Sequence, residues 1–171
     1  GVVTGATSIT STAFVGDLTG KATVNKGTKH FGDYIKLLPS DFVANIDGGN
    51  TKFGVGYVNT AGEADYGISV ANAATELFAF VSIPEGMEAT HVEVFGRRPK
   101  AVEVFEVQIN ATTLTSKGTG TCGIPADTIG DEEFAITNVT STATNLLAIE
   151  VTVTSNSADK VYGGRVKIAA V

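Results

Sequence analysis

The sequence predicts an all-β protein, an antiparallel β-sandwich or jelly-roll knob preceded by an extended N-terminal segment. First, 43% of the 171 residues are hydrophobic and only 18% are charged, below the usual charged share of about 25%. Thr, Ser, Asn and Gly must supply the rest of the polar surface, a balance that suits strands and tight turns. Second, short apolar runs recur between turn signals. Third, no long stretch has the 3.6-residue period of an amphipathic helix, so the crossovers of a parallel α/β fold are missing.

The chain divides into an extended shaft or oligomerisation segment, residues 1–33, and a β-sandwich knob, residues 34–171. Residues 8–20 are apolar, β-branched and punctuated by glycine, and no similar segment follows. A lone strand can neither bury its side chains nor pair its backbone groups. We therefore expect this segment to pair with copies of itself, through Ile9, Phe14, Val15 and Leu18. Because the chain opens on Gly1, we expect it to be processed or to continue upstream.

About eight strands are expected from residue 51 onward, and one more is expected at residues 34–38. They are residues 34–38, 52–58, 66–70, 77–83, 89–96, 101–110, part of 129–139, 146–154 and 162–171. Pro39-Ser40-Asp41 is typical of a turn or helix start, with Ser40 as its cap. A phase slip at Val104-Phe105 predicts a bulge or a strand buried on both faces, and residues 117–123 are expected to form a glycine-rich loop.

The last two segments alternate most clearly between apolar and polar residues, which is typical of half-buried strands. Leu147, Ile149, Val151 and Val153 are predicted to point inward, with Glu150, Thr152 and Thr154 on the other face. Likewise Val166 and Ile168 are predicted to point inward, and Arg165 and Lys167 outward.

Charge and composition exclude several classes of function. A net charge of −6 argues against a broad nucleic-acid surface, which needs clustered Lys and Arg. The basic cluster at 97–100 is interpreted as a solvated turn. The one cysteine, Cys122, excludes an internal disulfide framework and a thiolate metal site, and we expect it to be a small loop or core residue. No apolar run reaches the roughly 20 residues of a membrane span, so membrane insertion is not expected.

Catalytic chemistry has few candidates, and we predict a non-enzymatic protein without cofactor or metal. His30 and His91 are the only imidazoles. His91 and Glu93 share one strand face, which we interpret as a solvent-facing polar surface. Glu103 and Glu106 are expected on opposite faces unless a bulge intervenes, and the acidic residues 131–133 are expected in a solvated loop.

Tyr57, Tyr66 and Tyr162 are the candidate ligand-binding residues. Sugar sites on such knobs usually use exposed aromatic side chains, and this chain has no Trp. Buried positions in strands explain the three tyrosines equally well.

Residues 11–20, Ser-Thr-Ala-Phe-Val-Gly-Asp-Leu-Thr-Gly, resemble a motif of tailed-bacteriophage fibre proteins. In those shafts, units of this kind occur singly or in series. The resemblance implies a trimeric fibre whose shaft chains wind around one another and end in β-rich knobs. Burying Ile9, Phe14, Val15 and Leu18 around a threefold axis at roughly 25 cal/mol per Å² contributes several kcal/mol per chain.

The resulting hypothesis is a virion structural protein, a homotrimeric fibre with a host-surface-binding knob. Its expected partners are identical copies, other virion proteins on the N-terminal side, and a host surface glycan or protein; nucleic acid is not among them. Its expected location is the virion, assembled in the host cytoplasm. The alternatives are a capsid decoration or cement protein and a carbohydrate-binding or depolymerising domain.

Overall fold

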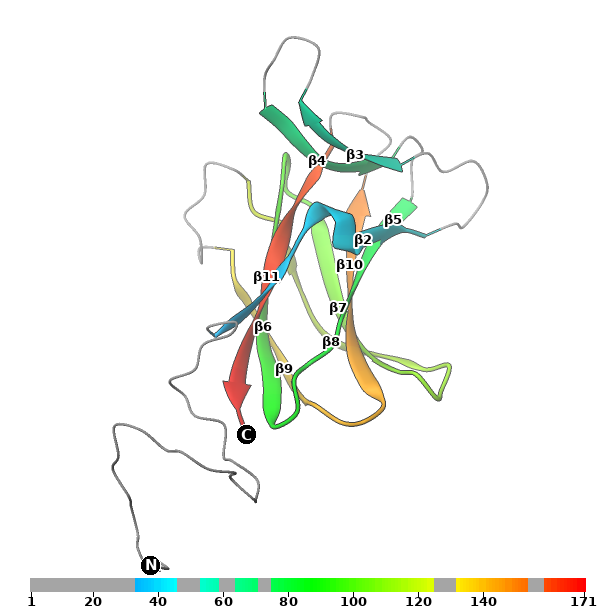
Figure 1. Cartoon of the computed structure of the whole chain (residues 1–171), viewed down its shortest axis with the longest axis vertical. Coiled ribbons are helices and arrows are strands. Elements are labelled where there is room, and N and C mark those ends of the chain that lie inside the picture. The colour runs from blue at the N-terminus through cyan, green and yellow to red at the C-terminus, as the bar shows by residue number, and fades with distance from the viewer. Residues whose placement is uncertain (1–32, 46–52, 59–63, 71–74, 125–131, 154–158) are drawn as a thin grey trace, which may run out of the picture.

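The computed structural model is an antiparallel β-sandwich, which confirms the predicted fold class (Figure 1). It describes residues 33–45, 53–58, 64–70, 75–124, 132–153 and 159–171. Residues 1–32, with the predicted contacts of Ile9, Phe14, Val15 and Leu18, lie outside this part of the chain. The division at residue 33 therefore stays a prediction. One short helix, the 3-10 turn η1 (Pro39–Asp41), accompanies eleven strands in the described residues.

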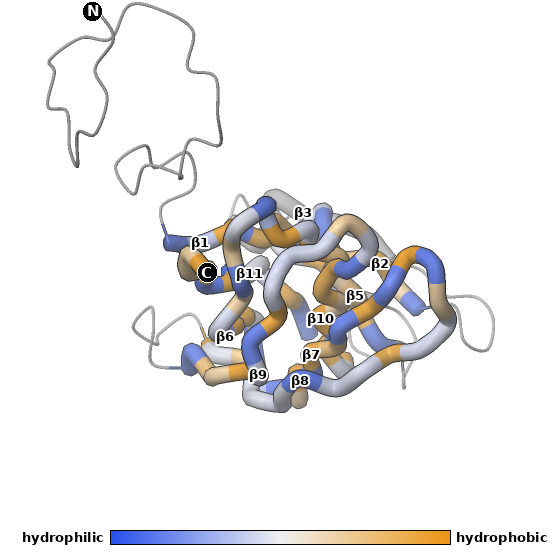
Figure 2. The backbone as a smooth tube through the Cα atoms, turned by 90° about the horizontal axis from the view of Figure 1, so that it is seen from below, coloured by the Kyte–Doolittle hydropathy of each residue, from blue (hydrophilic) through white to orange (hydrophobic). Residues whose placement is uncertain are grey.

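Two sheets form the layers of the sandwich, and Figure 2 shows them end-on. The six-stranded sheet has the order β3 (Phe53–Val58), β4 (Ala64–Val70), β11 (Val161–Ala170), β6 (Met87–Gly96), β9 (Phe134–Thr140), with β1 (Tyr34–Leu37) also paired to β11. The five-stranded sheet has the order β2 (Phe42–Ala44), β5 (Thr75–Val81), β10 (Asn145–Val153), β7 (Ala101–Gln108), β8 (Leu114–Thr121). Chain neighbours often lie in different sheets, so the hydrophobic face of each sheet is covered by the other.

The core lies between the sheets and follows the predicted alternation. Leu147, Ile149, Val151 and Val153 are buried, as are Val166 and Ile168 of β11. Side chains on a strand alternate between faces, and these residues take the inner face. The outward positions Arg165 and Lys167 are half-buried by neighbours on the outer face.

Two local predictions were wrong. Most of 117–123 belongs to strand β8 and not to a loop. The glycines of β8 lie under side chains of β9, because a Cβ at Gly118 would come within 3.0 Å of Ile136, and one at Gly120 would overlap the ring of Phe134. In η1 the N-cap residue is Leu38 and not Ser40, and Asp41, the last residue of η1, accepts from the Leu38 N–H through its Oδ2 at 2.7 Å.

The predicted irregularity at Val104-Phe105 is confirmed as a bulge in the pairing of β7 with β8. Val104 pairs with Gly118 and Phe105 with Ser116, so the extra residue is Lys117 on β8. The bulge reverses the phase of β8 relative to β7. Lys117 there forms an ion pair with Glu106 at 2.7 Å.

The basic cluster at 97–100 is only partly a solvated turn. Arg97, Arg98 and Pro99 are exposed, but Lys100 is buried and its Nζ lies 2.6 Å from Asp159 Oδ1. Cys122 is a core residue, as predicted. Burial raises the pKa of its thiol to about 12, and the nearby positive charge of Lys100 offsets this only in part.

Candidate functional site

An apolar groove of about 430 Å³ crosses the outer face of the five-stranded sheet, at one end of the sandwich. Its lining comes from β2, β5, β7 and β10 and from the connection between β7 and β8. The lining residues are Val43, Ala44, Asn45, Phe78, Phe80, Val107, Ala111, Thr112, Thr113, Leu114 and Ala148. Most of these side chains are apolar, whereas Asn45, Thr112 and Thr113 bring polar groups.

The strand register explains why the outer face has a depression here. Ala148 of β10 lies directly between Phe80 of β5 and Phe105 of β7. A methyl group between two larger aromatic residues leaves room above it. Phe78 and Phe80 are two residues apart on β5, so they share this face, and their rings are stacked with centroids 6.2 Å apart and planes at 13°.

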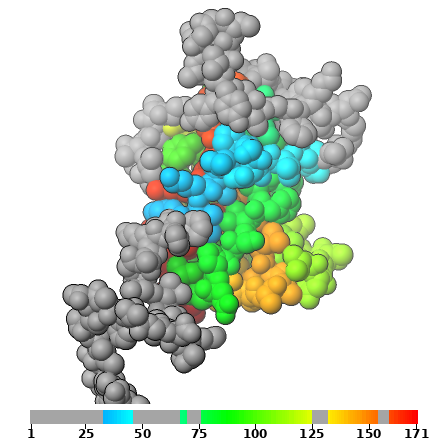
Figure 3. Space-filling model, in the orientation of Figure 1, coloured from blue at the N-terminus to red at the C-terminus, as the bar shows by residue number. Residues whose placement is uncertain are grey.

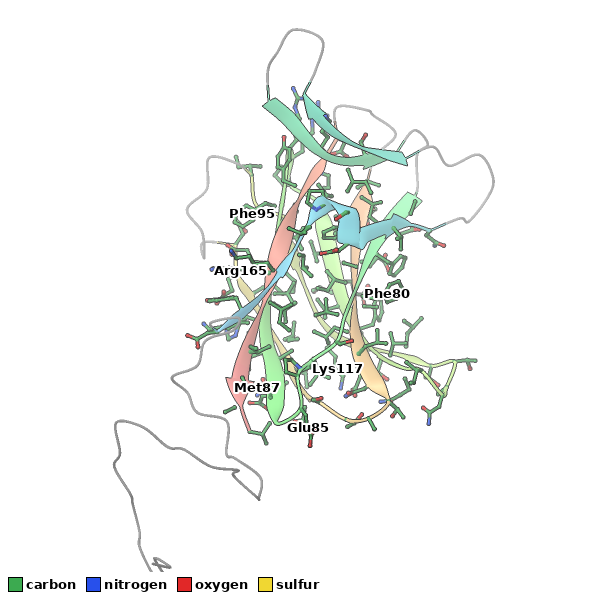
Figure 4. The ribbon with its side chains drawn as sticks, in the orientation of Figure 1. Phe80, Glu85, Met87, Phe95, Lys117 and Arg165 are labelled. Carbon is green, nitrogen blue, oxygen red and sulfur yellow. The ribbon has the colours of Figure 1, made fainter. Side chains whose placement is uncertain are left out.

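Exposed apolar side chains gather around this groove. Phe80 is 58% exposed, Leu114 56% and Val43 46%. Single exposed apolar residues are ordinary, but a contiguous patch marks an interaction surface. In Figure 4, Phe80 lies on the side of the molecule opposite Arg165, away from the core.

The far wall of the groove is held by contacts between two loops. The Ile109 N–H donates to the Thr144 carbonyl at 2.8 Å, and the Thr144 hydroxyl lies 2.7 Å from Gln108 Oε1. Figure 3 shows the β7–β8 connection (lime) against the segment that leads into β10 (orange). This anchoring places residues 111–113 beside Leu114 at the rim.

Three carboxylates lie beside the groove on the same outer face. In the strand register, Glu150 of β10 lies opposite Glu103 of β7 on one side and opposite Phe78 of β5 on the other. Glu76 is two residues from Phe78 on β5. Burial, followed by the charges of Glu76 and Glu103, raises the pKa of Glu150. In the described part of the chain, no three His, Cys, Asp or Glu side chains form a group that could hold a metal ion.

The outer face of the six-stranded sheet carries a network of charged side chains. Arg165 Nε lies 2.6 Å from Glu93, Arg165 Nη2 lies 3.3 Å from Glu133, and Lys167 Nζ lies 3.1 Å from Glu133. The Arg165 guanidinium also covers the Tyr34 ring, 4.0 Å from its centroid. Burial tends to raise the pKa of Glu133, but hydrogen bonds from Lys167 and Tyr34 and the nearby cations outweigh it and hold the pKa below its ordinary value.

The prediction that Glu93 faces solvent was wrong, and the prediction that Glu103 and Glu106 lie on opposite faces of one strand is confirmed. Glu93 is fully buried under Arg165 and does not face solvent. Glu103 lies on the outer face and accepts a hydrogen bond from Ser116 at 2.8 Å. Glu106, three residues along β7, pairs with Leu147, whose side chain is in the core, and so lies on the opposite face, where it binds Lys117 and Asn145.

The three candidate tyrosines lie on adjacent strands of the six-stranded sheet. Tyr57 belongs to β3, Tyr66 to β4 and Tyr162 to β11. Tyr162 is not among the described residues that line the groove on the other sheet. Sequence reasoning missed Phe78 and Phe80 because residues 77–81 are all apolar, and such a run does not show which residues face outward.

Comparisons with known proteins include a distant structural likeness. No family model matches the chain, and no curated protein does either. A solved structure, the CBM36-1 domain of a multidomain xylanase from the hindgut metagenome of Trinervitermes trinervoides, is similar with a TM-score of 0.43 and 15% sequence identity. The alignment covers 81% of this chain and 99% of that domain. A likeness of this size carries no argument about a ligand. Within the described residues, no helix is long and apolar enough to cross a membrane.

Proposed function

We propose that this β-sandwich is a non-enzymatic carbohydrate-binding domain, and that the groove beside Phe78 and Phe80 holds the sugar rings. The observation that carries the proposal is the composition of this groove: the stacked rings of half-buried Phe78 and exposed Phe80, with amide, hydroxyl and carboxylate groups beside them. Binding sites for small molecules are typically apolar with a few convergent polar groups.

A sugar ring matches both the aromatic and the polar groups of this groove. Its C–H groups form an apolar face with slight positive polarisation, which the negatively polarised face of a phenylalanine ring attracts. Its hydroxyl groups lie around the edge, where Asn45, Thr112 and Thr113 of the groove donate and accept hydrogen bonds. A volume of about 430 Å³ is at the lower end of ligand pockets, roughly 300–1,000 Å³, and suits a short stretch of glycan.

The test compares two equally exposed apolar residues. Phe80 is 58% exposed and lines the groove, whereas Leu38 is 56% exposed and does not. We expect Phe80→Ser to weaken binding at least about tenfold, as loss of an aromatic anchor does, and Leu38→Ser to leave it unchanged. Affinity electrophoresis against soluble β-glucan, xylan, mannan and partly deacetylated chitin gives the measurement, and circular dichroism checks the fold.

Two results would contradict the proposal. Either the chain binds no glycan of the panel, or Phe80→Ser and Leu38→Ser bind equally well. Release of reducing ends from any of these glycans would contradict the non-enzymatic part, because Glu103 and Glu150 would then act as a pair of catalytic carboxylates.

A second candidate function, a trimeric phage fibre with a host-binding knob, is favoured by the motif at residues 11–20. A glycan-binding face is compatible with it, since a knob of this kind attaches to a host surface. We expect light scattering to give three chains per particle, and Phe14→Asp to shift the particle toward a monomer. A wild-type chain that is monomeric at all concentrations would exclude the fibre and leave the carbohydrate site untouched.

A further inference from the structure

The row of carboxylates lies next to the apolar groove on the same outer face. Phe78 lines the groove and lies directly opposite Glu150 on the neighbouring strand. Asn45, another lining residue, donates from its side-chain amide to Glu76 Oε2 at 3.1 Å. A ligand that lies over the phenylalanine rings therefore brings its substituents within reach of these carboxylates.

The row lacks cationic partners among the residues that the structure describes. Glu76 accepts from the Asn45 amide and Glu103 from the Ser116 hydroxyl, and both donors are neutral. Cations among the described residues bind other carboxylates: Lys117 binds Glu106, Lys100 binds Asp159, and Arg165 and Lys167 bind Glu133 on the other sheet. Glu150 lies between Glu76 and Glu103, and both of these charges raise its pKa.

Charge complementarity then favours one kind of occupant. Three carboxylates beside an apolar groove attract a ligand that combines an apolar face with positive charge. An anionic glycan is repelled by the same charges, and a neutral one gains only hydrogen bonds. Among sugars, the required combination belongs to amino sugars with a free, protonated amine.

We infer that the groove binds glycans bearing free ammonium groups, such as oligomers of glucosamine, in preference to neutral glycans of the same linkage. The inference rests on the proposed carbohydrate function and specifies its ligand class. Glu103 and Glu150 are the groups that distinguish the two ligands, and the phenylalanine rings hold both.

The experiment uses three β-1,4-linked hexamers of one length, built from glucosamine, N-acetylglucosamine and glucose. Isothermal titration calorimetry with the full chain, in mildly acidic low-salt buffer, measures each affinity. We expect the glucosamine hexamer to bind about tenfold more tightly than the other two, because several partly exposed ion pairs each contribute a small amount. Added salt is expected to reduce this preference.

Variants separate the contribution of the carboxylate charges to affinity from the contribution of the apolar groove. The double variant Glu103→Gln and Glu150→Gln is expected to bring the three affinities within about twofold of one another, while the glucose hexamer keeps its wild-type affinity. Glu106→Gln is the matched control, because Glu106 is on the same strand but on its other face, paired with Lys117. It is expected to keep the preference.

Each alternative result has a distinct meaning. Equal wild-type affinities, or a preference that survives the double variant, would overturn the inference, while loss of neutral-glycan binding in Phe80→Ser would still support the proposed function. No binding of any hexamer would overturn both. An oligomer that Phe80→Ser dissociates, together with no glycan binding, would assign this face to a second copy of the chain and would also overturn both.

Discussion

The two outer faces of the sandwich differ in the contacts that their charged and aromatic side chains make. On the six-stranded sheet, Arg165 contacts Glu93, Glu133 and the Tyr34 ring, so the side chains satisfy one another. On the five-stranded sheet, Phe80 is 58% exposed, and burial together with the charges of Glu76 and Glu103 raises the pKa of Glu150. Figure 4 shows Arg165 and Phe80 on opposite sides of the molecule. This difference leads us to expect that the charged network of the six-stranded sheet contributes more to stability than the outer face of the five-stranded sheet.

The largest expected effect is on the six-stranded sheet. Glu93→Ala leaves Arg165 without its shorter ion pair, and removing one partner of a buried pair is strongly destabilising. We expect a loss of about 3 kcal/mol in the free energy of unfolding, near the lower end of the usual range, because Arg165 keeps Glu133. Urea denaturation gives the measurement. Glu103→Ala, on the opposite face, is the control and is expected to be nearly neutral; equal losses would remove the distinction between the faces.

A smaller effect is expected for one phenylalanine on each face. Phe95 of β6 is half-buried and packs near Gly123, with which it forms a backbone bridge. Phe95→Ser is expected to lower the free energy of unfolding by about 2 kcal/mol, as expected for removing a partly buried ring. Phe80→Ser is expected to cost less than about 1 kcal/mol, because the ring is mostly exposed. Thermal unfolding of the two variants measures both losses. A larger loss for Phe80→Ser than for Phe95→Ser would mean that Phe80 stabilises the fold.

The smallest effect is on the pH dependence of stability, which has opposite signs on the two faces. The pKa of Glu133 is held below its ordinary value of 4.5, so its contribution is present above that pH and is lost as the pH falls through its folded pKa. The pKa of Glu150 is raised above 4.5, so stability is lost as the pH rises from 4.5 through its folded pKa. Each contribution is expected to be about 1 kcal/mol or less.

Glutamine variants test both signs. Glu133→Gln is expected to flatten the loss of stability in acid, and Glu150→Gln to remove the loss that begins above pH 4.5. Urea unfolding at a series of pH values measures each curve. A Glu150→Gln curve parallel to that of the wild type would mean that this carboxylate does not interact with its acidic neighbours.

The sequence allowed the fold class and the inner face of several strands to be predicted, because alternation is a local property. The alternating residues of β10 and β11 are buried as expected. The strand β8 was missed because its glycines resemble a loop, and only the side chains of Phe134 and Ile136 from the other sheet explain them.

The candidate site depended on register, which the sequence alone does not contain. The hollow exists because Ala148 lies between Phe80 and Phe105, three residues that are distant along the chain. The burial of Glu93 likewise depends on its pairing with Arg165, 72 residues away. Local patterns predict which residues face one way, but not which of them become neighbours.

The single cysteine of the chain makes unfolding of the sandwich measurable without any mutation. Cys122 is 1% exposed and its thiol has a pKa of about 12, so a disulfide reagent such as Ellman's finds almost no thiolate in the native protein at neutral pH. Modification then requires opening of the region around the junction of β6 with residue 123. The rate of colour development, followed over denaturant concentrations too low to unfold the bulk of the sample, reports how often that region opens.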